Sequence, residues 1–167
     1  MKNEITGMRL RLIVMNFLQF AVWGAYLTSM GTYLFNIGLG AKIGLFYAMQ
    51  GIVSLFMPAI MGIIADRWVP AQKLYGFCHF MAAVFMVAAG WYGYVDGEAV
   101  NFGTLFTFYS LSVAFYMPTL ALTNSVAYTA LDKVKLDPVI AFPPIRIFGT
   151  IGFICSMLLL SLIHISE

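Results

Sequence analysis

Three residues between positions 146 and 153 have the side-chain types and the spacing to hold a flat, polar ring compound. At about 100° per residue of a helix, Arg146, Thr150 and Phe153 fall within an arc of about 60°. Arginine offers a planar fork of N–H donors, threonine a hydroxyl group and phenylalanine a face for stacking. The alternative is that the arginine extends its charged end to a membrane surface while the other two side chains only pack.

A second candidate face lies near the start of the chain. Asn16, Gln19, Trp23 and Tyr26 fall within an arc of about 80° at helical pitch. Polar amides inside hydrocarbon normally face the interior of a helix bundle. The two aromatic residues could instead belong to an interfacial belt, but their position near the middle of an apolar segment favours an interior role. We therefore predict that Gln19, Trp23 and Tyr26 line a cavity.

A third face contains Asn124 and Tyr128, which are spaced to share one side of a helix with Met117. Asn124 is a further candidate for substrate binding. The alternative, which we favour, is a structural hydrogen bond between helices, worth on the order of 0.6 kcal/mol.

The acidic residues all fall in expected loops, at helix ends or at a terminus: Glu4, Asp66, Asp96, Glu98, Asp132, Asp137 and Glu167. Hydrolysis within a membrane needs paired carboxylates deep in the bilayer or an H-E-x-x-H helix, and the sequence has neither.

His79 and His164 have no second histidine or carboxylate at ligand spacing. Cys78 and Cys155 lie in apolar runs, where a thiol packs as a small hydrophobic group. We expect no enzyme, no catalytic residue and no metal site.

Long apolar segments must position these candidate faces. The composition is 62% hydrophobic and only 10% charged, which leaves too little polar surface to cover a soluble globule. Several uncharged stretches reach the roughly 20 residues that a helix needs to cross a bilayer. Strands of a membrane barrel would be shorter and would alternate in polarity. The sequence predicts an all-α, polytopic transmembrane bundle with spans at about 12–35, 43–65, 74–95, 102–131 and 139–163.

Basic residues occur in alternate connections between these spans: Lys2, Arg9, Arg11, Arg67, Lys73, Lys133 and Lys135. The opposite connections contain only Lys42, together with Asp96 and Glu98. Lysine and arginine are enriched on the cytoplasmic side of short loops, so we predict a cytoplasmic N-terminus. The net charge of +2 without a basic tract argues against a nucleic-acid partner and leaves the lipid bilayer as the expected surroundings.

Residues 62–67 resemble the G-x-x-x-D-R signature of the major facilitator superfamily. The resemblance implies that Asp66 and Arg67 form a conformational latch with the end of a neighbouring helix. Trp68, Val69 and Pro70 depart from the pattern, because a second glycine and basic residues usually follow.

Three further segments are similar to the bacterial nucleoside:proton symporters of that superfamily: residues 17–24, 116–120 and 142–153. The similarity runs from about Arg9 to Ser161 and covers the first five of the family's twelve helices. It implies a multi-pass protein of the bacterial inner membrane that carries a nucleoside, with the proton as coupling ion and no other cofactor. It also implies that Arg146 and Thr150 donate hydrogen bonds to the nucleoside and that Phe153 forms a wall of the site.

Proton coupling needs a titratable group whose exposure changes during transport, and no acid lies deep in these segments. The coupling carboxylate is therefore expected in a C-terminal half that is absent here. We expect this chain to be the N-terminal part of a larger transporter that works by alternating access. Two alternatives are a superfamily member for another solute, such as a sugar or a drug, and a small membrane subunit that does not transport.

Overall fold

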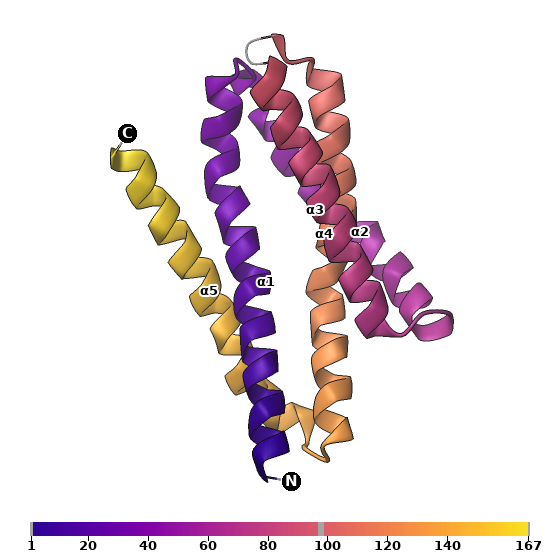
Figure 1. Cartoon of the computed structure of the whole chain (residues 1–167). Helices are drawn as coiled ribbons and strands as arrows, with labels where there is room; N and C mark the ends of the chain where they lie inside the picture. Colours follow the sequence, from indigo (N-terminus) through magenta and orange to yellow (C-terminus); the bar gives the residue numbers. More distant parts are fainter. Residues whose placement is uncertain (1, 97–98, 167) are drawn as a thin grey trace. The chain divides into compact units, whose positions relative to one another are not determined.

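The computed structural model describes residues 2–96 and 99–166, and its side chains between residues 4 and 163 within those ranges. The expectations that involve Glu98, Glu167 and the side chain of His164 lie outside this description. The elements are α1 (Lys2–Asn36), the short 3-10 helix η1 (Gly40–Lys42), α2 (Ile43–Arg67), α3 (Ala71–Asp96), α4 (Phe102–Lys133) and α5 (Pro138–Ser166), as Figure 1 shows.

All five α-helices are long and apolar enough to cross a membrane. The predicted all-α, polytopic class is thus confirmed, and the described residues contain no strand. Each predicted segment lies within an observed helix, but α1 begins at Lys2 rather than near Leu12. The first N–H groups of a helix have no partner within the helix, and hydrocarbon cannot satisfy them. Water can do so in the more polar segment before Leu12, so α1 can begin there.

Two helices end in the same hydrogen-bonded turn. At the end of α1, Gly38 N–H donates to Phe35 O and Leu39 N–H donates to Leu34 O, with Gly38 at a φ of 78°. At the end of α4, Lys135 occupies the equivalent left-handed position, with a φ of 56°. This pattern is the Schellman motif, in which glycine is the usual residue.

The start of α5 is capped by a side chain. The Asp137 carboxylate accepts a hydrogen bond from Val139 N–H at 2.9 Å, and Pro138 occupies the first helical position. Pro143 and Pro144 lie further inside the helix, and they have no N–H for the carbonyl groups of Val139 and Ile140.

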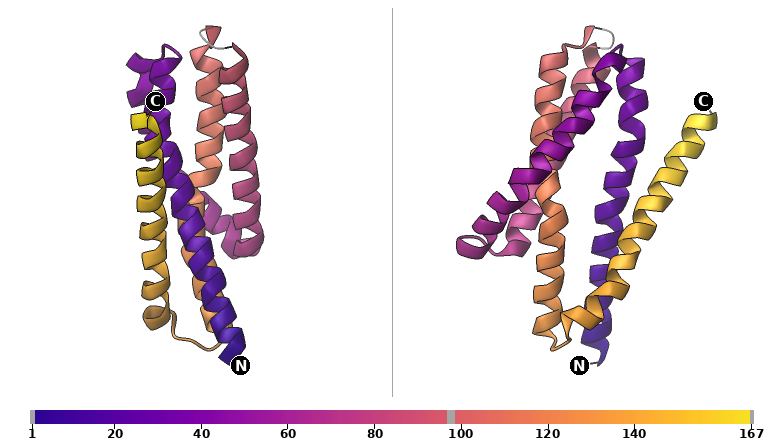
Figure 2. Two further views of the ribbon diagram at one scale, coloured as in Figure 1. Left: turned by 60° about the vertical axis from the view of Figure 1, so that its left-hand side comes forward. Right: turned by 180° about the vertical axis from the view of Figure 1, so that it is seen from behind.

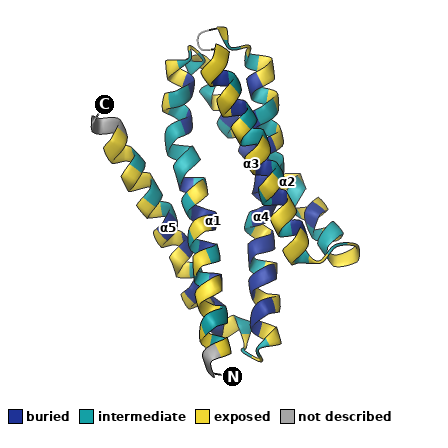
Figure 3. Cartoon of the chain, in the orientation of Figure 1, coloured by how far each residue is buried: buried dark blue, intermediate teal, exposed yellow. Residues whose placement is uncertain are grey.

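The chain divides into two compact units. The first contains the described residues up to Met30 and from Thr123 onward. Its hydrophobic core joins α1, α4 and α5 through Leu12, Ala127, Ala130, Leu131, Ala141, Phe142 and Ile145. Small residues on α4 allow the large side chains of its neighbours to pack closely. Most of the remaining surface of α5 is exposed (Figure 3).

The second unit is formed by residues 31–122. One core cluster contains Met61, Leu74, Cys78 and Leu122. Two buried polar contacts join other parts of the unit: Gln50 Nε2 donates to Tyr109 Oη at 2.8 Å, and Ser112 Oγ donates to Ala82 O at 2.7 Å. Buried polar groups are costly without partners, so these bonds favour one arrangement of the helices.

Candidate substrate-binding face

Glycines bring α1 and α5 close together within the first unit (Figure 1, Figure 2). A Cβ atom added at Gly152 would collide with the carbonyl oxygen of Phe17. One added at Gly24 would lie 2.5 Å from Ser156 Oγ and 2.7 Å from Phe153 O. The two backbones can approach this closely only because these positions lack side chains.

The close approach assembles a cation–aromatic strip from Arg146, Phe20, Trp23 and Phe153. The Arg146 Cζ atom lies 3.9 Å from the centroid of the Phe20 ring. The ring centroids of Phe20 and Trp23 are 6.0 Å apart. Trp23 in turn meets Phe153 edge-on, with centroids 5.6 Å apart and an interplanar angle of 65°. The structure therefore joins two residues predicted on the α5 face to one predicted on the α1 face.

Two members of the strip have hydrogen-bond donors that the described residues do not use. Arg146 is half-buried, and within the described part of the chain it makes no hydrogen bond and no ion pair. Trp23 Nε1 is buried and also finds no acceptor there. An arginine in an apolar span normally pairs with another group or contacts a ligand, so these unused donors make the strip a candidate for ligand binding.

The other predicted residues lie in different environments. Gln19 is 2% exposed, Tyr26 and Asn124 are half-buried, and Thr150 is exposed and takes no part in the ring contacts of the strip. Tyr128 packs edge-on against Phe142 on α5, with ring centroids 4.9 Å apart.

Phe20 is the member of the strip that was not predicted. At about 100° per residue it lies roughly 40° beyond Asn16, outside the polar arc of the first helix. The sequence pointed to Phe20 only because it lies within residues 17–24, the segment that resembles the symporter family.

The expected latch residues belong to the second unit. Asp66 and Arg67 are both exposed at the C-terminal end of α2. Neither forms an ion pair with any residue that the structure describes. Their role as a latch stays a prediction.

His79 has the surroundings of a packed residue. Its Nδ1 atom lies 3.0 Å from Tyr75 O, and its ring contacts the rings of Tyr75 and Tyr116. Between residues 2–96 and 99–166, no group of three or more histidine, cysteine, aspartate or glutamate side chains could hold a metal ion.

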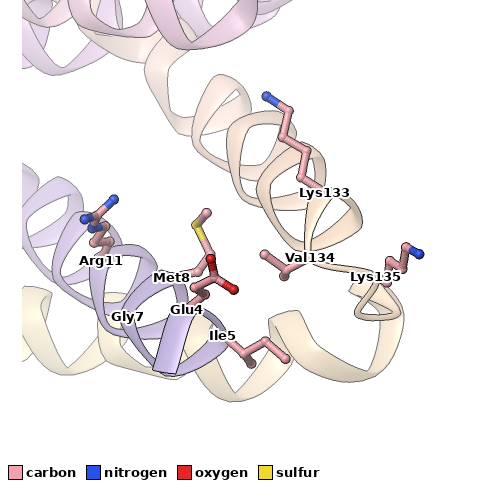
Figure 4. Close-up of a pocket in the computed structure, with 8 residues that line it drawn as sticks. All are labelled: Glu4, Ile5, Gly7, Met8, Arg11, Lys133, Val134 and Lys135. Carbon is pink, nitrogen blue, oxygen red and sulfur yellow. The ribbon is translucent and has the colours of Figure 1, made fainter. Parts of the chain in front are cut away.

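A cavity of about 580 Å³ opens at one end of the first unit, between the start of α1 and the connection from α4 to α5 (Figure 4). It is lined by Glu4, Ile5, Gly7, Met8, Arg11, Lys133, Val134 and Lys135. Figure 4 shows the Glu4 carboxylate beside Met8 in the middle of the cavity, whereas Lys135 points away. None of the predicted binding residues lines it, so we separate this cavity from the candidate face.

Five helices long enough to cross a membrane define the class of the protein as a multi-pass membrane protein, and the strip around Arg146 is its candidate binding face. Residues 6–167 match the model of the family described as nucleoside H+ symporter, and the chain belongs to this family.

Two relatives come from Escherichia coli strain K12. The xanthosine permease is 43% identical over 158 residues, and the nucleoside permease NupG is 40% identical over 159 residues. Each match covers 93% of this chain and 36% of the relative, so the chain spans just over a third of their length.

Solved structures agree with these matches. Crystal structures of the nucleoside transporter NupG, as an aspartate-to-alanine mutant and without that substitution, give TM-scores of 0.83 and 0.80 at 39% identity. Both matches cover 93% of this chain and 37% of the solved chain. The expected fold, part of the N-terminal half of a major facilitator transporter, is confirmed.

Proposed function

We propose that these helices form the N-terminal part of a proton-coupled nucleoside transporter that works by alternating access. Membership of the nucleoside H+ symporter family and two nucleoside-transporting relatives at 43% and 40% identity support this proposal. The relatives are permeases, so we propose transport and not catalysis. Because the chain spans 36% of their length, the activity belongs to a longer polypeptide whose remaining helices complete the site.

The substrate-binding residues in this proposal are Arg146, Thr150 and Phe153 on α5, Gln19, Trp23 and Tyr26 on α1, and Asn124 on α4. The observation that carries the proposal is the half-buried guanidinium of Arg146, which lies against Phe20 with all its N–H donors unused in the described chain. A nucleoside offers a flat base with ring and carbonyl acceptors, and a ribose with hydroxyl groups. A planar fork of donors beside aromatic rings suits such a ligand.

Proton coupling is assigned to the remaining part of the polypeptide. The described acids Glu4, Asp66, Asp96, Asp132 and Asp137 lie at helix ends or in connections, where they cannot alternate between the two sides of a membrane. The proton is then the coupling ion, with no other cofactor, and Asp66 and Arg67 act as a latch for one conformational state.

The proposed location is the bacterial inner membrane with a cytoplasmic N-terminus. One cavity is lined by Arg11 near the start of α1 and by Lys133 and Lys135 near the connection from α4 to α5. These basic residues therefore lie on the same side of the first unit. Such a grouping of basic residues is typical of the cytoplasmic face.

The direct test is uptake of labelled uridine, adenosine and xanthosine by the complete gene product in cells that lack their own nucleoside transporters. We expect uptake that a protonophore abolishes and that Arg146→Ala reduces roughly tenfold to a hundredfold, the range for a hydrogen bond to a charged group. Arg9→Ala is the matched control, because Arg9 is exposed near the start of α1.

A well-expressed protein that takes up a sugar or a drug but none of these nucleosides would overturn the substrate class. Uptake that persists in the presence of the protonophore would instead overturn proton coupling.

A further inference from the structure

Phe20 is the single specific partner that the described chain provides for the Arg146 guanidinium. The distance of 3.9 Å from Cζ to the ring centroid places the cation in close contact with the ring face. An aromatic ring attracts a cation placed over its face. This attraction does not use the N–H donors of the guanidinium, which point outward in its own plane and stay available to a ligand. Phe20 is also confined, because it is only 8% exposed and packs beside Trp23.

Gly149 leaves the space in which this contact forms. It lies one helical turn beyond Arg146 on α5. A Cβ atom added there would lie 2.7 Å from Phe20 Cδ2 and 2.8 Å from Arg146 Nη1. Both distances are shorter than a van der Waals contact. The guanidinium is the end of a long, flexible side chain and moves easily, whereas the buried ring can shift only slightly. The added methyl group would therefore separate the guanidinium from the ring.

We propose that Phe20 and Gly149 are positioning residues for substrate recognition: the ring holds the Arg146 guanidinium in one plane, and the glycine leaves room for it. The proposal rests on the proposed function, because it deepens the role of the same face. A guanidinium with a fixed plane loses little freedom when its donors meet a ligand, and such preorganisation raises affinity. Without the ring, the guanidinium samples several directions and the same hydrogen bonds cost more to form.

The first test compares two substitutions of Phe20 in the complete gene product. Phe20→Leu keeps an apolar side chain but removes the ring face, and we expect KM for the transported nucleoside to rise roughly tenfold with little change in maximal rate. Phe20→Tyr keeps the ring face and should stay within about threefold of the unsubstituted protein. Phe17→Leu on the same helix is the control. Equal KM values for Phe20→Leu and Phe20→Tyr, or a lower KM for Phe20→Leu, would overturn the proposal.

The second test compares two glycines of the same helix. Gly149→Ala should raise KM and lower the thermal stability of the purified protein only moderately, because its Cβ atom meets two side chains, those of Phe20 and Arg146. Gly152→Ala should lower thermal stability more strongly, because its Cβ atom meets the backbone carbonyl of Phe17. An unchanged KM for Gly149→Ala would contradict the positioning role.

A third measurement separates this inference from the proposed function. Thermal unfolding of Phe20→Leu, Arg146→Met and the double variant in detergent needs no substrate. Residues in direct contact give non-additive effects, so we expect the double variant to lose less stability than the sum of the single variants. Additive losses of thermal stability would mean that Phe20 and Arg146 do not interact, and they would overturn this inference even if the complete protein transports nucleosides. Non-additive shifts without any nucleoside uptake would instead reject the proposed substrate and keep the contact.

Discussion

Trp23 combines a ring that packs with an indole N–H that the described residues leave without an acceptor. A buried donor without a partner lowers the stability of a protein, but it gains a hydrogen bond if the ligand supplies an acceptor. Trp23→Phe keeps a ring against Phe153 and removes the donor. We expect nucleoside affinity to fall by roughly tenfold while thermal stability without ligand stays equal or rises.

Isothermal calorimetry with the transported nucleoside, together with thermal unfolding of the free protein, measures both effects. Trp91→Phe is the matched control, because Trp91 is 68% exposed on α3. Unchanged affinity with Trp23→Phe would exclude the indole N–H from ligand binding.

At the scale of the helices, the end of α4 has an unfavourable residue in its closing turn. Lys135 adopts a φ of 56°, which costs a residue with a Cβ atom about 1 kcal/mol and costs glycine almost nothing. Lys135→Gly is therefore expected to stabilise the protein by about 1 kcal/mol. Lys133→Gly, at the last residue of the helix itself, should destabilise it by a similar amount.

Thermal unfolding of the purified protein in detergent would show the two shifts. A lower melting temperature for Lys135→Gly would mean that the lysine side chain makes a stabilising contact that outweighs the backbone cost.

The start of α5 depends on its cap in the same way. Asp137→Ala removes the acceptor of the 2.9 Å hydrogen bond from Val139 N–H and should destabilise the protein by about 1 kcal/mol. Asp137→Asn keeps an acceptor at the cap and should retain most of the stability, which the same unfolding assay measures. Equal losses in both variants would assign the effect to the charge and not to the cap.

For the whole molecule, the proposed orientation predicts which connections meet a reagent added from outside. Ala41 in η1 and Gln72 in the first turn of α3 are both exposed, and they should face opposite sides of the membrane. In a Cys155→Ser background, Ala41→Cys should react with a membrane-impermeant maleimide in intact spheroplasts. Gln72→Cys should react only after the membrane is permeabilised. Cys78 is buried, so it should contribute little labelling. The opposite pattern would place the N-terminus outside the cell.

Some features of this protein follow from the sequence alone. In a bilayer the backbone must satisfy its own hydrogen bonds, so apolar runs of about 20 residues become helices, and their number and approximate positions can be read from composition. Helical pitch also placed Arg146 and Phe153 on one side of the last helix. The segments 17–24, 116–120 and 142–153 were sufficient to indicate the family, to which the chain belongs.

Other features depend on how the helices pack. Helical pitch gives the direction in which a side chain points around the axis of its helix. It does not identify the neighbouring helix or the distance between the two backbones. Gly24 and Gly152 set that distance for α1 and α5, and it brings Phe20 against Arg146 and Trp23 against Phe153. For this reason periodicity found the polar residues of the α1 face, whereas the apolar partner of the cation became visible only in the tertiary structure.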